Sequence, residues 1–102
     1  MQEKRTHPRV SIGLDVRCEV KDGPVFEGHG KDISLGGMFV ESGEVLAFGT
    51  AVTIVARLPG GTDDARLPAV VRWNSAGGFG VQFGLMGARD THAITRLMKG
   101  GR

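Results

Sequence analysis

The sequence of 102 residues is poor in several residue types, and each shortage argues against a class of protein. A single cysteine, Cys18, rules out an internal disulfide and favours a reducing compartment, so we expect a cytoplasmic protein. No apolar run approaches the roughly 18 residues that a membrane-spanning helix needs, and the N-terminus lacks the apolar segment of a signal peptide. We therefore expect no membrane association.

Motifs of the common catalytic and metal sites are also missing. There is no phosphate-binding loop ending in Gly-Lys-Ser/Thr and no Gly-x-Gly-x-x-Gly after a strand. His7, His29 and His92 are far apart in the sequence and have no ligand-like partner at metal spacing. Ser34 has no base near it in the sequence, although a triad can assemble in space. We predict a protein that is not an enzyme and that holds no metal and no cofactor.

What the chain has in abundance is glycine, with 17 glycines against 4 prolines. Glycines placed between short apolar runs indicate many tight turns, which are typical of an all-β barrel or sandwich. The length fits one domain with a small core. No internal repeat and no second domain is evident.

Alternation of apolar and polar residues predicts six strands, followed by one helix. The clearest strand runs from Val10 to Val20 and places Cys18 on the apolar face, where a packed core thiol is expected. Trp73 falls in phase with two apolar residues of the fifth strand, so we expect core packing for it as well. The expected strands are 10–20, 25–33, 38–41, 51–58, 65–73 and 79–83.

The pattern changes to helical spacing near the C-terminus. Asp90 can cap a helix, because a side-chain oxygen at that position satisfies an unpaired backbone amide. Four apolar residues follow at helical spacing, and Gly100-Gly101 ends the segment. We therefore expect an amphipathic helix over about 90–99, laid on the barrel.

The net charge of +2 is concentrated in the first nine residues, which hold Lys4, Arg5 and Arg9 against Glu3. A general nucleic-acid binder spreads its positive charge over a broad face. The two arginines offer flat forks of donors that match phosphate oxygens and the O6 and N7 acceptors of guanine. Residues 1–9 show no periodicity, so we interpret them as an extended, ligand-gripping arm. A disordered tail is the alternative.

A second unusual stretch, Asp32-Ile33-Ser34-Leu35-Gly36-Gly37, lies between the second and third expected strands. Asp32 offers acceptors for the N1–H and N2–H donors of guanine, and Ser34 can donate or accept a hydrogen bond. Gly37 has no Cβ, so its backbone can approach a flat base closely. The alternative is an ordinary β-turn, because Asp, Ser and Gly dominate turns for backbone reasons.

Taken together, Arg5-x-x-x-Arg9 and Asp32-x-Ser34-x-x-Gly37 resemble the two motifs of the PilZ domain family. The segments 36–40, 71–73 and 78–83 look like later barrel strands of that family. The resemblance implies a six-stranded antiparallel β-barrel domain over 10–102, with a C-terminal helix and a flexible N-terminal arm over 1–9. It also implies binding of the bacterial second messenger cyclic dimeric guanosine monophosphate, or cyclic di-GMP.

In that family, the arginines of the arm engage guanine and phosphates, and the second motif holds guanine from the barrel side. Lys4 occupies a position where arginine in relatives tends to accompany a stacked pair of ligand molecules. Lysine keeps the charge but does not stack as arginine does. Lys4 is therefore a possible additional contact, and the number of ligand molecules is left open.

Three functional hypotheses follow from the sequence. In the first, the chain is a cyclic di-GMP receptor whose arm becomes ordered over the barrel and alters a surface for a partner protein. In the second, it is an adaptor of the same fold that binds proteins and takes up ligand weakly or not at all. The third is a binder of single-stranded nucleic acid. That class stacks bases on exposed aromatic residues, and the aromatic residues here are better explained by core packing.

Overall fold

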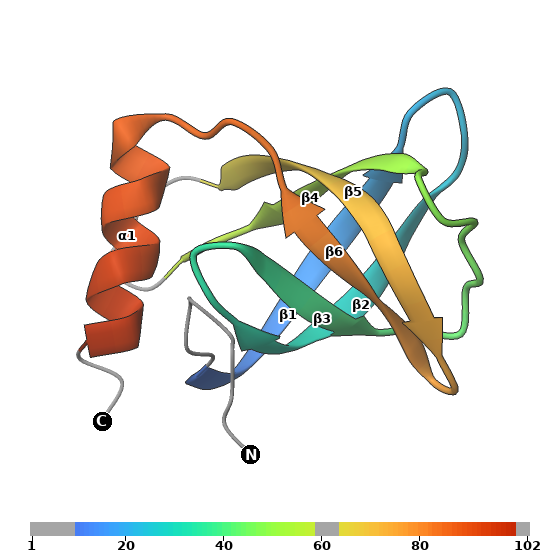
Figure 1. Cartoon of the computed structure of the whole chain (residues 1–102), viewed down its shortest axis with the longest axis horizontal. Helices are drawn as coiled ribbons and strands as arrows, with labels where there is room; N and C mark the ends of the chain where they lie inside the picture. The colour runs from blue at the N-terminus through green and yellow to red at the C-terminus, as the bar shows by residue number, and fades with distance from the viewer. Residues whose placement is uncertain (1–9, 59–63, 100–102) are drawn as a thin grey trace, which may run out of the picture.

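Six antiparallel strands close into a barrel in the computed structural model, which describes residues 10–58 and 64–99 (Figure 1). Around the barrel the strands follow the order β1-β2-β3-β6-β5-β4. The strands are β1 (Val10–Val20), β2 (Val25–Ile33), β3 (Gly37–Glu41), β4 (Ala51–Ala56), β5 (Ala65–Ser75) and β6 (Gly78–Phe83), and the helix is α1 (Ala88–Lys99). This architecture confirms the predicted all-β fold with one C-terminal helix. The predicted arm over residues 1–9 lies outside the described residues.

Four strand ends differ from the sequence prediction, and two of the differences are that β3 and β6 each begin one residue earlier than expected. β5 continues to Ser75, because Asn74 and Ser75 pair with Phe79 and Gly78 of β6 where a turn was expected. β4 ends at Ala56, two residues earlier than expected. The first two strands have the expected bounds.

The helix begins earlier than predicted, at Ala88. The amide of Thr91 donates to the Gly87 carbonyl at 3.1 Å, so the first helical turn is already closed there. Asp90 is therefore not the capping residue; it lies inside the first turn, where a negative charge is favourable toward the helix dipole.

The barrel interior is filled by alternate residues of all six strands. Cys18 and Phe79 are fully buried, and Phe26 meets Phe79 edge to face with ring centroids 6.1 Å apart. At one end of the barrel α1 packs its apolar face on this core through Ile94, which is fully buried. At the opposite end the β3–β4 connection buries Leu46 (Figure 1). The predicted core position of Cys18 is confirmed.

Trp73 is not a core residue, contrary to the expectation from alternation. Its side chain is 41% exposed. The register of β5 against β6 shifts between Val71 and Trp73, so one extra residue, Arg72, lies at a β-bulge. The bulge reverses the alternation, and Trp73 faces outward while Val71 faces the core. Arg72 places its guanidinium 5.3 Å from the ring centroid of Phe48.

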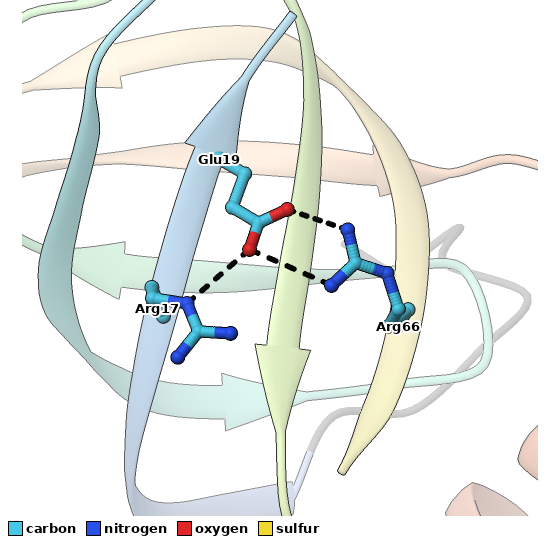
Figure 2. Close-up of polar contacts among 3 residues, drawn as sticks. All are labelled: Arg17, Glu19 and Arg66. Atoms are coloured by element: carbon cyan, nitrogen blue, oxygen red, sulfur yellow. Dashed lines mark hydrogen bonds and ion pairs between the residues drawn. The ribbon is translucent and has the colours of Figure 1, made fainter.

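On the outer face of β1, β4 and β5, Glu19 forms an ion network with two arginines (Figure 2). Glu19 lies between Arg17 on its own strand, 3.2 Å away, and Arg66 on β5, which binds it through both guanidinium ends. Val55 of β4 is directly opposite Arg17 and Arg66 and is 4% exposed. The side chains of these flanking charged residues shield Val55 from solvent.

Candidate functional site

The stretch Asp32–Gly37 joins β2 to β3 through a tight turn whose geometry is organised by Ser34. The Ser34 amide donates to the Gly37 carbonyl at 2.8 Å. The Ser34 hydroxyl accepts hydrogen bonds from the amides of Gly36 and Gly37, at 3.1 and 3.2 Å. Ser34 is the one polar residue that is buried among the described residues, at 4% exposure. Its hydroxyl oxygen therefore holds the turn. Within the turn, the hydroxyl proton is donated to the Gly37 carbonyl, at the long distance of 3.5 Å.

Gly37 is required by the packing of two strands. A Cβ at this position would overlap the carbonyl oxygen of Val81 on β6. Gly37 pairs with Gln82, and the Phe83 amide donates to the Gly36 carbonyl at 2.8 Å. The turn is thus attached directly to β6, so the close approach that the glycine allows is an approach to the barrel itself.

Asp32 is half-buried and lies on the outer face of the barrel. The register of β2 against β3 shifts between Gly30 and Asp32, which indicates a β-bulge at Lys31. Gly30 is opposite the inward-facing Val40, whereas Asp32 is opposite Phe39, and Ile33 is again fully buried. The bulge therefore turns the carboxylate outward, a common use of bulges next to binding sites.

Strand register places Asp32 and Trp73 in one row across the outer face. Asp32 is opposite Phe39 on β3, Phe39 is opposite Gly80 on β6, and Gly80 is opposite Trp73 on β5. Directly opposite residues in a sheet share a face. With neighbouring strands about 4.8 Å apart, the row covers roughly 14 Å along the barrel surface. Sequence reasoning missed Trp73 as a member of this site, because alternation does not reveal a bulge.

Glycines in and beside the middle of this row leave room for the aromatic rings. A Cβ at Gly80 would overlap the indole of Trp73, and a Cβ at Gly78 would lie within 3.0 Å of the Phe39 ring. Both glycines are buried, while Trp73 keeps one part of its ring exposed. An aromatic surface of this kind suits a planar ligand, and the carboxylate at the other end suits its donors.

The predicted arm joins the barrel beside the same row. Val10, the first described residue, is opposite Ile33, and Ser11 is opposite Asp32. The predicted contacts Lys4, Arg5 and Arg9 lie outside the described residues. Of the predicted site residues, the structure therefore places Asp32 near the end of β2, Ser34 in the turn that follows, and Gly37 at the start of β3.

The described residues hold no group of three or more potential metal ligands. No helix in the described part of the chain is long and apolar enough to cross a membrane. The described residues thus form a small closed β-barrel domain with an outward carboxylate, an aromatic row and a serine-organised turn.

The PilZ domain model matches residues 3–100, and the chain belongs to the PilZ domain family. This family consists of receptor and effector domains, not of enzymes. A comparison with curated proteins found no significant match.

Several solved structures share this fold. The PilZ domain of CeSA from a cellulose-synthesising bacterium has a TM-score of 0.72 at 24% identity, over 91% of this chain and 96% of that one. The PilZ domain of YcgR from Escherichia coli, solved with c-di-GMP, has a TM-score of 0.74 at 15% identity. The match covers 96% of this chain and 91% of that one. The MrkH–c-di-GMP complex from K. pneumonia has a TM-score of 0.74 at 19% identity, and the match covers 97% of this chain. The chain spans about half, 52%, of the length of MrkH.

Proposed function

We propose that this chain is a cyclic di-GMP receptor. The observation that carries the proposal is the outward carboxylate of Asp32, which lies in one row with an exposed tryptophan and beside the strand where the N-terminal arm joins the barrel. Family membership supports it, since the relatives YcgR and MrkH were solved with this ligand.

In the proposed complex, Asp32 accepts hydrogen bonds from the N1–H and N2–H donors of a guanine. Arg5 and Arg9 engage the phosphates and the Hoogsteen edge of guanine, and Lys4 adds a positive charge. Ser34 acts mainly by holding the turn that presents Asp32. The exposed ring of Trp73 gives a second base a surface on which to stack.

Ligand binding orders the arm over the barrel in this proposal. Ordering costs roughly 1–2 kcal/mol for each residue that becomes fixed, and charge-assisted hydrogen bonds to the phosphates offset the cost. The ordered arm then presents an altered surface to a partner protein.

Calorimetric titration of cyclic di-GMP tests this function. We expect heat of binding with the unmutated chain, and its loss in Arg9→Ala and in Asp32→Ala. Glu27→Ala is the matched control for Asp32, because it removes an exposed carboxylate from the same strand. Arg57→Ala is the control for Arg9. The stoichiometry also reports whether one or two ligand molecules bind.

No heat from the unmutated chain at tens of micromolar ligand would contradict the receptor function. In that case the adaptor hypothesis gains support if a partner is retained regardless of ligand and of Arg5→Ala.

A further inference from the structure

The outer face of α1 carries a stripe of basic side chains that the ligand site does not use. Arg89, His92 and Arg96 are all exposed, whereas Ile94 on the opposite face is fully buried. Their spacing of three and four residues places them on one side of the helix. The two arginines lie seven residues apart, or about 10 Å along the axis.

No ion pair neutralises this stripe within residues 10–58 and 64–99. Asp90 is the one acidic residue of α1, and its position is a quarter turn away from that of Arg89. The ion pairs of the described residues are all on the barrel strands and their connections. The positive charges of the two arginines are therefore not neutralised by an ion pair and can attract an acidic partner.

Charge is divided between the barrel and the helical segment. Residues 10–83 hold nine acidic and six basic side chains, while residues 84–102 hold four basic and one acidic. The connection into α1 also presents Leu85, which is 96% exposed. The surface therefore offers a narrow positive stripe with an apolar residue near one end.

We propose that this stripe, formed by Arg89, His92 and Arg96 with Leu85, is a docking surface for an acidic segment of another protein. A membrane or a nucleic acid is an extended anionic surface that would also face the net negative barrel, which opposes its approach. A short acidic helix avoids this repulsion, and carboxylates at matching spacing lie opposite the two arginines. The proposal concerns output to a partner and does not depend on which ligand the barrel binds.

The test uses a defined probe, an alanine-based helical peptide with three glutamates at i, i+3 and i+7 and one leucine. We expect the full chain to bind it, with affinity falling as salt rises. Arg89→Gln with Arg96→Gln should weaken binding about fivefold to tenfold. Lys21→Gln with Lys31→Gln removes the same charge from the barrel and should change affinity less than about twofold. Leu85→Ser should weaken binding about tenfold.

Charge reversal separates recognition from damage to the fold. The chain with Arg89→Glu and Arg96→Glu should no longer bind the glutamate peptide and should bind a matched peptide with lysines in place of the glutamates. Unchanged peptide affinity in the glutamine variant overturns the proposal. So does tighter binding to phosphatidylglycerol vesicles or to a single-stranded oligonucleotide that depends on the same arginines. Self-association that Arg89→Gln with Arg96→Gln abolishes would instead assign the surface to a second copy of the chain. If every variant retains the heat of binding of cyclic di-GMP in calorimetry, the ligand site is intact.

Discussion

Asp32 on β2 and Trp73 on β5 each follow a β-bulge, and the strand register places both in one row on the outer face of the barrel. In each strand the extra residue reverses the alternation, so that a side chain that would face the core faces solvent. The carboxylate and the indole therefore belong to one surface, although they lie 41 residues apart in the sequence.

The first prediction uses Trp73 as a probe, since it is the sole tryptophan. Stacking of a guanine on the indole should quench its fluorescence as cyclic di-GMP is added, and Asp32→Ala should remove the response. Trp73→Ala should weaken the ligand by about 1–3 kcal/mol, the usual contribution of base stacking on an aromatic residue. Fluorescence that stays constant through a calorimetrically saturating titration would count against a ligand at this end of the row.

Gly80→Ala tests the contact beneath the indole. The added methyl group overlaps the Trp73 ring, which must move away from the strand. We expect a loss of about 1–2 kcal/mol in the free energy of unfolding, measured by urea denaturation. Gly43→Ala is the control, because a Cβ there meets nothing within 4 Å, and it should stay within about 0.5 kcal/mol. Equal stability of the two variants would contradict the packing described.

Gly37→Ala should be the more damaging of the glycine substitutions. Its methyl group meets the backbone carbonyl of Val81, and a strand moves less easily than a half-exposed side chain. We expect a loss of about 3 kcal/mol or more in the free energy of unfolding. Urea denaturation of Gly37→Ala beside Gly80→Ala checks the order. If Gly37→Ala keeps full stability yet loses ligand, the glycine serves the ligand rather than the barrel.

Glu19→Gln should change how stability depends on pH. The hydrogen bond from Arg66, with a smaller contribution from Arg17, holds the pKa of Glu19 below its usual value. A lowered folded-state pKa contributes stability that is present above the unfolded-state pKa and is lost as pH falls through the folded-state value. The unmutated chain should therefore exceed Glu19→Gln in stability at neutral pH, and the difference should vanish in acid. Denaturation midpoints across pH measure it, with Glu44→Gln as an exposed control that should show no such trend.

Cys18 should be unreactive in the folded chain. Burial raises the pKa of the thiol to about 11, so the nucleophilic thiolate is scarce at pH 8, and the side chain has no exposed surface. Iodoacetamide should label the chain in urea and not under native conditions. Rapid native labelling would show that the barrel opens near Cys18.

Alternation predicted the barrel well because its strands are buried on one face only. The long period-two run from Val10 to Val20 has the bounds found in the structure, and the switch to helical spacing located α1 within two residues at its start. Both results follow from burial patterns that a local window of sequence can contain.

The bulges could not be predicted in the same way. A bulge depends on which residues of the neighbouring strand are opposite, so Lys31 and Arg72 look like ordinary strand residues in the sequence. The prediction for Trp73 was wrong for this reason, and the outward direction of Asp32 was left undetermined. The sequence predicted Asp32 at the end of a strand and Ser34 and Gly37 in the turn that follows it, as the structure has them, but the contacts of Ser34 and Gly37 with the turn and with β6 became evident only from the structure.

The row that ends in Asp32 and Trp73 also fixes the distance between these two residues. Its ends are separated by three strand spacings of a hydrogen-bonded ladder, a length that side-chain motion alters little. In the proposed complex, a mononucleotide has one base and occupies one end of the row, whereas a ligand with two bases has a second base to place over the indole. Under the proposed function, the barrel selects its ligand by length as well as by chemistry, because three strand spacings separate Asp32 from Trp73.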